Sequence, residues 1–121
     1  MLKYILNNLH ISADGQYAWS SISHQMIEEL QPESTDIDGL INTIKDIEGV
    51  EIAILFRGVE ANRTKASLRS KVWADVNQIA GMFGGGGHVR ASGVSIDGDV
   101  EYAAALMEPA VLDIIRQHSA E

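Results

Sequence analysis

The sequence predicts a single α/β domain, in which a mixed sheet of about five strands carries helices packed on it. The chain has 121 residues, the usual size of one domain, and 45% of them are hydrophobic. Runs rich in β-branched residues alternate with stretches whose apolar positions recur at helical spacing. No internal repeat or low-complexity linker divides the chain, so we expect residues 1–121 to form one domain.

The N-terminal part is expected to begin with two strands joined in a hairpin. Residues 4–11 and 17–23 are short, largely apolar runs, and the Asp14-Gly15 pair between them is a frequent hairpin turn. Ser23 can cap a short helix over residues 24–30, because its hydroxyl can accept from a backbone N–H of the first turn.

A longer helix is expected after a polar break at residues 31–35. Asp36 or Asp38 can cap it, and Gly49 is placed to end it. Its apolar residues recur at helical spacing and predict the buried face: Leu40, Ile41, Ile44 and Ile47.

The middle of the chain predicts two strands and a helix. Residues 50–56 are the most β-like run, with the even-numbered residues on one face, and 58–62 are a loop. A strand over 64–71 should be antiparallel to the first because the connection is short. Asp75 can cap a helix that runs through residue 82. The residues expected to be buried in that helix are Val76, Ile79 and Ala80.

The last part begins with a glycine run and ends with the longest helix. A strand is expected over residues 91–96, a turn at 97–99 and a helix over 100–117. Pro109 lies inside that helix, where its missing N–H should kink or split it.

Composition excludes several classes of protein. The chain has no cysteine, which excludes disulfides and thiolate metal sites and fits a reducing compartment. No apolar run approaches the ~20 residues that span a bilayer, and the N-terminus lacks the cleavage site of a signal peptide. We therefore expect a cytoplasmic protein that makes no membrane contact.

The distribution of charge indicates a local anion site. The formal net charge of −8 opposes general attraction to a nucleic-acid backbone. Six of the nine Lys and Arg residues nevertheless lie between positions 57 and 90. Side chains alternate along the strand expected there, so one face would carry Arg63, Lys65, Ser67, Arg69 and Lys71. Such groups suit phosphate, although a solvated outer strand would show the same pattern.

The glycine run strengthens the binding interpretation. Gly84, Gly85, Gly86 and Gly87 cost backbone entropy and bury no side chain, so they indicate a close backbone approach or positive φ angles. Their N–H groups can converge on an anion, and His88 after them can donate to a phosphate oxygen. A flexible surface linker is the alternative, but the apolar residues that flank the run are not typical of linkers.

Four segments together resemble a known family: Ser67-Leu68-Arg69-Ser70, residues 75–80, Phe83 to His88, and Ala91-Ser92-Gly93. They are similar to the C-terminal DHH-associated domain of DHH-family phosphoesterases, most of all in the oligoribonuclease (nanoRNase) and phosphoadenosine-phosphate phosphatase branch. The resemblance implies a domain that binds the nucleotide and phosphate end of a substrate. It also implies an N-terminal DHH domain, whose Asp and His residues hold two divalent metals, usually manganese.

The resemblance implies a set of substrate-binding residues: Arg57, Ser67, Arg69, Gly84, Gly85, Gly86, Gly87 and His88. The bound partner would be a nucleotide phosphate or a short oligonucleotide. The Asp-His-His motif is absent and the four histidines have no carboxylate at ligand spacing, so we expect no catalytic residue, metal or cofactor in this chain. The chain is expected to be inactive alone, as the substrate-binding part of a longer hydrolase.

Several alternatives stay open. One is a stand-alone nucleotide-sensing module without catalysis, and another is a fragment of a cyclic-dinucleotide phosphodiesterase. The related domain of alanyl-tRNA synthetases fits the serine-arginine and glycine-histidine segments less well, and a purely structural dimerisation module leaves the glycines unexplained. The apolar faces are compatible with a homodimer. The substrate remains open among short RNA, short DNA, cyclic dinucleotides and small bisphosphates.

Overall fold

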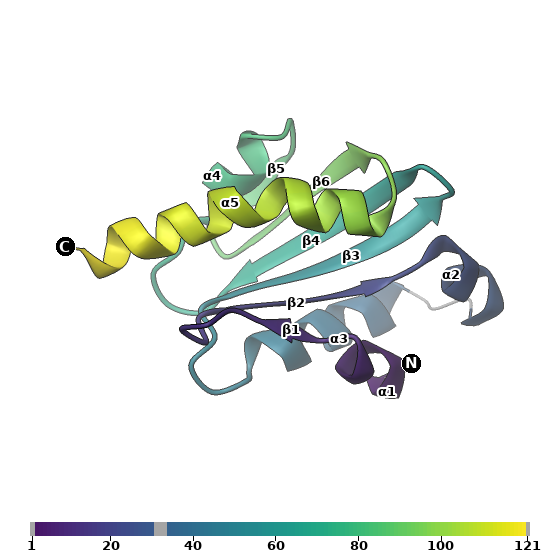
Figure 1. Ribbon diagram of the computed structural model, residues 1–121, viewed down its shortest axis with the longest axis horizontal. Helices are drawn as coiled ribbons and strands as arrows, with labels where there is room; N and C mark the ends of the chain where they lie inside the picture. Colours follow the sequence, from purple (N-terminus) through teal and green to yellow (C-terminus); the bar gives the residue numbers. More distant parts are fainter. Residues whose placement is uncertain (1, 31–33, 121) are drawn as a thin grey trace.

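A six-stranded mixed sheet organises the computed structural model, which describes residues 2–30 and 34–120 (Figure 1). Its strands are β1 (His10–Ile11), β2 (Tyr17–Ile22), β3 (Ile52–Glu60), β4 (Arg63–Ser70), β5 (Gly86–His88) and β6 (Ala91–Asp97). They lie in the order β1-β2-β3-β4-β6-β5, with β2 and β3 parallel and all other neighbours antiparallel. The predicted α/β fold class is confirmed, with one strand more than expected.

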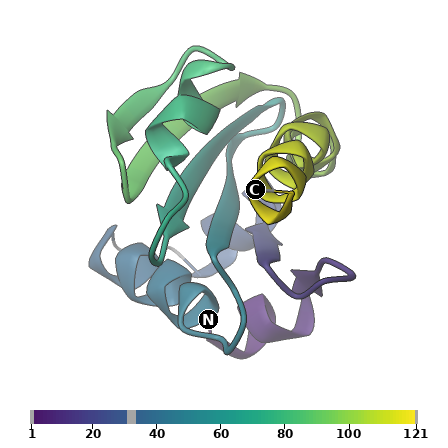
Figure 2. The same ribbon diagram turned by 90° about the vertical axis from the view of Figure 1, so that its left-hand side faces the viewer.

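Helices cover both faces of the sheet. In the described part of the chain they are α1 (Leu2–Asn7), α2 (His24–Leu30), α3 (Ser34–Lys45), α4 (Val76–Gly81) and α5 (Val100–Ser119). On one face, α4 and α5 bury Ile52, Ile54 and Phe56 of β3. On the other face, α1, α2 and α3 cover Ala53 and Leu55. Figure 2 shows the sheet between α5 on one side and α3 with α1 on the other. No helix in the described ranges is long and apolar enough to cross a membrane.

The predicted local signals are present in most of these elements. Gly15 has a φ of 79° in the turn between β1 and β2. The N–H of Met26 donates to the Ser23 hydroxyl at 3.2 Å, and Asp75 caps α4 by accepting from the N–H of Gln78 at 3.2 Å. The apolar residues predicted for α3 and α4 are buried or packed against the core.

The strand expected over residues 4–11 is wrong, because residues 2–7 form α1. Leu2, Ile5, Leu6 and Leu9 are spaced three or four apart, which places them on one side of a helix. Ile5 is fully buried, and its carbonyl accepts from the Ser20 hydroxyl at 2.8 Å. The extended part of this segment is reduced to β1.

The ends of α3 and β3 also differ from expectation. α3 begins at Ser34, ahead of the predicted aspartate caps, and ends at Lys45 rather than beside Gly49. Residues 31–33 of the predicted break lie outside the described residues. The loop expected at 58–62 is mostly strand, since β3 continues to pair with β4 as far as Glu60. Val50 precedes β3 and packs in the cluster beneath α3, not on the face of Ile52.

Pro109 does not split the C-terminal helix, which runs without a break from Val100 to Ser119. Both Pro109 and Ala105, whose carbonyl would accept from a residue at position 109, are exposed. Solvent can therefore take the place of the missing hydrogen bond, and the helix continues. Asp99 caps its first turn by accepting from the N–H of Tyr102 at 2.8 Å.

Candidate functional site

Part of one sheet face is not covered by helices. α1, α2 and α3 pack on β2 and β3, and α3 reaches β4, but β6 and β5 extend beyond α3 (Figure 2). Strand pairing sets Arg57 beside Lys65 and Lys65 beside Ser95, so these three side chains share the uncovered face. Ser67 and Gly93 are paired in the next row. The alternation of residues along β4 that the sequence predicted is therefore present.

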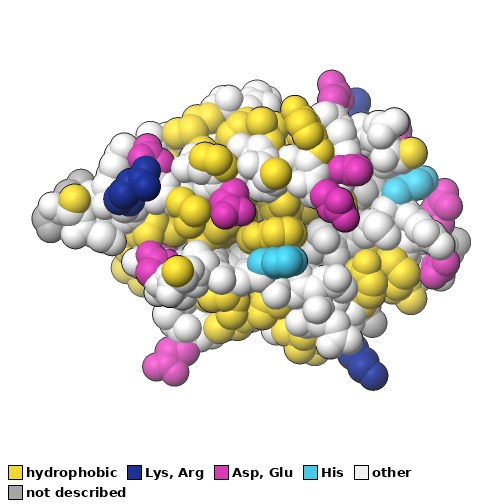
Figure 3. Space-filling model, viewed as in Figure 1, with side chains coloured by type: hydrophobic (Ala, Val, Ile, Leu, Met, Phe, Trp, Pro, Cys, Tyr) yellow, Lys and Arg dark blue, Asp and Glu magenta, His cyan; other side chains and the backbone are white. Residues whose placement is uncertain are grey.

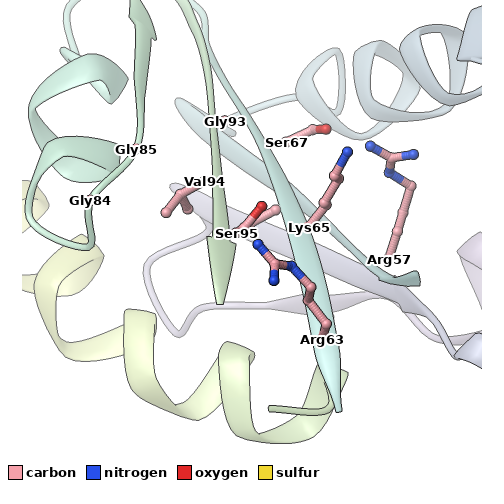
Figure 4. Close-up of a pocket in the computed structure, with 10 residues that line it drawn as sticks. Arg57, Arg63, Lys65, Ser67, Gly84, Gly85, Gly93, Val94 and Ser95 are labelled. Carbon is pink, nitrogen blue, oxygen red and sulfur yellow. The ribbon is translucent and has the colours of Figure 1, made fainter. Parts of the chain in front are cut away.

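These residues line an open hollow of about 540 Å³. Three cations, Arg57, Arg63 and Lys65, lie along it with the hydroxyl groups of Ser67 and Ser95, and its far wall includes Gly84, Gly85 and Gly93. Figure 4 shows the side chains of Arg57 and Lys65 running side by side from neighbouring strands, with Ser67 beyond them. The arrangement combines positive charge with hydroxyl donors, and both kinds of group bind phosphate.

Arg57 is the most enclosed cation of the hollow. Burial lowers the pKa of its guanidinium from the ordinary value, and the charge of Asp38 opposes that change. Its Nε is buried and has no hydrogen-bond partner in the part of the chain that the structure describes. A desolvated cation with a free donor binds an incoming anion more strongly than an exposed one does, because the local dielectric is lower.

Arg69 and His88 lie on the same face but do not line the hollow. Arg69 Nη2 donates to Asp38 Oδ1 of α3 at 3.2 Å, and Nη1 donates to the Leu68 carbonyl at 2.9 Å. His88 is exposed on the edge strand β5 and is linked to Arg69 through Ala91, the residue of β6 that pairs with both. Two strand spacings separate them, which is roughly 10 Å.

The glycine run forms a wall by shape and not by free N–H groups. The N–H groups of Gly84, Gly85 and Gly87 donate to the Gly81 carbonyl, the Ala80 carbonyl and Asn77 Oδ1. A Cβ at Gly85 would lie 2.3 Å from the carbonyl oxygen of Gly93, and one at Gly87 would lie 2.8 Å from that of Ala91. The predicted cradle of converging N–H groups is thus wrong for these three glycines. They allow the loop to lie directly on β6.

Two of the six Lys and Arg residues between positions 57 and 90 have structural roles. Lys71 follows β4, and its Nζ donates to the carbonyl of Ile47 after α3, at 3.1 Å. The guanidinium of Arg90 donates to the carbonyls of Val72 and Ala74. Neither side chain belongs to the hollow, so the row of cations predicted from alternation is shorter than expected.

Glu51 has a structural role that no pattern in the sequence indicates. It is 5% exposed, and its carboxylate accepts from the N–H groups of Val72, Trp73 and Ala74 at 2.9–3.1 Å. Burial by itself would raise its pKa, but hydrogen bonds from these N–H groups hold the pKa below the ordinary value. Arg90 donates to the carbonyls of the same segment, Val72 and Ala74. Glu51 and Arg90 together therefore fix the segment that connects β4 to α4.

The part of the chain that the structure describes contains no group of three or more His, Asp or Glu side chains able to hold a metal ion. His10 and His118 stack on Trp19 and Trp73, with ring centroids 4.1 Å and 3.6 Å apart. His24 contacts the Gly58 carbonyl and Glu28. Three of the four histidines are therefore engaged away from the hollow.

The fold and the hollow define an α/β domain with a basic face that is lined by serine and glycine. A model of the DHHA1 domain family matches residues 15–117, so the chain belongs to the DHHA1 domain family. DHHA1 domains occur alongside an N-terminal DHH domain. The predicted relationship to DHH-family phosphoesterases is therefore confirmed at the level of the domain family.

Solved structures that are similar to the chain include the following two. An exopolyphosphatase-related protein from Bacteroides fragilis is 29% identical with a TM-score of 0.82, over 93% of this chain and 33% of that one. A pGpG-specific phosphodiesterase from Vibrio cholerae is 13% identical with a TM-score of 0.59, over 94% of this chain and 37% of that one. The second likeness shows the fold alone. The chain spans about a third of the length of each of these proteins.

Proposed function

We propose that this domain binds the phosphate groups of a nucleotide or a short single-stranded oligonucleotide and presents them to a DHH domain that hydrolyses the phosphoester. The observation that carries the proposal is the convergence of Arg57, Lys65 and Ser67 in one hollow on the uncovered sheet face. Three cations, Arg57, Arg63 and Lys65, lie together in a chain of net charge −8, which supports binding of an anion there.

The roles of the residues follow from their donors. The guanidinium of Arg57 would form paired hydrogen bonds with a phosphate, and Lys65 would add charge beside it. Ser67 would donate a further hydrogen bond. Arg69 and His88, at the end of the same face, would contact a second phosphate or the rest of the nucleotide. Gly84, Gly85, Gly86 and Gly87 would let the ligand approach the backbone closely.

The chemistry would reside in the DHH domain, whose two divalent metals, manganese by resemblance, activate water for attack on phosphorus. This domain would contribute positioning and neutralisation of the substrate's charge. In that form the whole protein is a cytoplasmic phosphoesterase of the oligoribonuclease or nucleotide phosphatase type, and the isolated chain binds without hydrolysis.

A second candidate ligand is inorganic polyphosphate. None of the described residues that line the hollow has an aromatic ring on which a base could stack. The relative from Bacteroides fragilis is described as related to exopolyphosphatases. Phosphate contacts within the hollow would serve both ligands, so the two are separated by affinity and not by the residues that bind.

Calorimetric titration of the 121-residue chain tests the proposal, with a 5′-phosphorylated diadenosine dinucleotide (pApA), adenosine 3′,5′-bisphosphate and tripolyphosphate as ligands. We expect Arg57→Gln to weaken binding at least tenfold, since hydrogen bonds to charged groups are the strong ones. Arg116→Gln is the matched control, because Arg116 lies on α5 and pairs with Asp113. Tighter binding of tripolyphosphate than of both nucleotides would favour the second candidate. Equal binding by wild type and Arg57→Gln would contradict the proposal.

A further inference from the structure

Arg69 is held at the boundary of the uncovered face by a carboxylate from α3. The Nη2 group donates to Asp38, and Nη1 donates to a backbone carbonyl of its own strand. The side chain of Arg69 is 21% exposed and that of Asp38 is 67% exposed. The ion pair is therefore accessible from solvent on the side of Asp38, and solvent screening weakens it.

The pair adjoins the hollow. Arg69 is two residues from Ser67 on the same face of β4, and side chains two apart on a strand are separated by about 7 Å. A change of side-chain rotamer, without movement of the strand, would turn the guanidinium of Arg69 toward Ser67. The contacts with Asp38 and with the Leu68 carbonyl oppose that rotation, and of the two only Asp38 carries a charge.

Asp38 also acts on the second arginine. Burial lowers the pKa of Arg57, and the charge of Asp38 is the influence that raises it. Among the described residues the Nε of Arg57 has no hydrogen-bond partner, so the guanidinium keeps a free donor. One carboxylate thus serves two arginines, and the site has capacity for a further anion.

We propose that Asp38 is an intramolecular competitor for the ligand's phosphate. It holds Arg69 in reserve until an anion that outcompetes it enters the hollow. A phosphodiester carries one charge, the same as Asp38, whereas a terminal phosphate carries nearly two at pH 7 and displaces it more readily. Asp38 therefore makes recruitment of Arg69 selective for terminal phosphomonoesters. The inference rests on the proposed function of the hollow.

The test compares pApA with the unphosphorylated dinucleotide ApA, titrated into wild type and variants of the 121-residue chain. Asp38→Asn keeps the size and an acceptor oxygen but removes the charge. It should tighten pApA about threefold to fivefold, as expected for release of an exposed ion pair. Asp46→Asn is the matched control: it changes the net charge equally, and Asp46 pairs with Lys45 at 3.8 Å instead.

Arg69→Gln provides the readout that a structural role would not move. In the wild-type background it should weaken pApA at least threefold and leave ApA within twofold. In the Asp38→Asn background it should weaken both ligands, and it should abolish the tightening caused by Asp38→Asn.

Unchanged or weaker pApA binding by Asp38→Asn would overturn the inference while leaving the proposed function standing. The same tightening in the Arg69→Gln background, or in Asp46→Asn, would also overturn it, since the effect would then be one of general charge. Absence of binding in every variant would overturn both the proposed function and the inference. Thermal unfolding of each variant checks that the fold is intact.

Discussion

Glu51 sits where a buried charge is stabilised entirely by backbone donors. Replacing it with Gln keeps the shape but turns an NH₂ group toward the N–H groups of Val72, Trp73 and Ala74. We expect Glu51→Gln to lower the free energy of unfolding by about 1–3 kcal/mol, the usual cost of unsatisfied buried donors. Urea unfolding at pH 7 measures this, with Glu48→Gln, at an exposed position, as the control.

The same carboxylate predicts a dependence on pH. The pKa of Glu51 is lower in the folded protein than its ordinary value of 4.5, so its contribution is fully present above about pH 4.5. The contribution is lost as the pH falls through the folded-state pKa. The stability difference between wild type and Glu51→Gln should therefore narrow below pH 4.5. A difference that stays constant from pH 7 to pH 3 would show that the charge of Glu51 has no part in it.

Two glycines offer opposite outcomes for the same substitution. At Gly85 a Cβ would meet the backbone of β6 at 2.3 Å, so Gly85→Ala should destabilise the domain by about 1–3 kcal/mol through overpacking. At Gly39, inside α3, nothing lies within 4 Å of the added Cβ, and alanine should stabilise the helix by about 0.5–1 kcal/mol. Urea unfolding of both variants measures the two changes in the free energy of unfolding. Equal stabilities would mean that the glycine loop does not lie directly on β6.

At the scale of elements, Pro109 lowers the stability of α5, because it cannot donate a hydrogen bond to the Ala105 carbonyl. Pro109→Ala restores a donor for the Ala105 carbonyl and should raise the free energy of unfolding by about 1–2 kcal/mol. This is the helical cost of proline reduced by the lost rigidity of the unfolded chain. Urea unfolding with Ala110→Gly as a control of opposite sign measures the change. A loss of stability in Pro109→Ala would show that the ring packs usefully in the folded state.

Elements with a strong local pattern could be predicted from the sequence, whereas elements decided by distant contacts could not. β3, β4 and α5 carry long periodic patterns, and caps such as Asp75 and Asp99 mark where helices begin. β5 consists of two glycines and a histidine, which have little tendency to form a strand. It exists because β6 pairs with it and Asn77 accepts from Gly87. α1 is too short for the spacing of its apolar residues to distinguish a helix from a strand.

Some features of the candidate site could likewise be predicted from the sequence, and others could not. Alternation along β4 predicted which side chains share a face, and Lys65 and Ser67 lie in the hollow as a result. The same alternation applied to β6 would have found Ser95. Asp38 could not be predicted as a partner of Arg69, because 31 residues separate them and α3 must first pack on the sheet.

For the whole molecule, the contrast between a basic hollow and an acidic remainder limits the size of the ligand. Figure 3 shows acidic and apolar side chains across the face that carries α5, with Lys and Arg few and near its margins. A long polyanion that extended from the hollow around to this opposite face of the sheet would meet acidic side chains and be repelled. A ligand of one to a few nucleotides gains the attraction of the hollow without that cost.

The dependence of affinity on salt tests this limit. If Arg57, Arg63 and Lys65 are the cations that neutralise phosphate, the logarithm of the binding constant should fall with the logarithm of salt concentration with a slope of about −2, from ~0.7 per contact on a single strand. The slope for a decanucleotide should match that for a trinucleotide, because the additional phosphates find no additional cations. Arg57→Gln should reduce the slope by about 0.7 and Arg116→Gln should not change it. A slope that steepens with oligonucleotide length would instead mean that the strand runs along a surface beyond the hollow, and that the acidic remainder does not confine it.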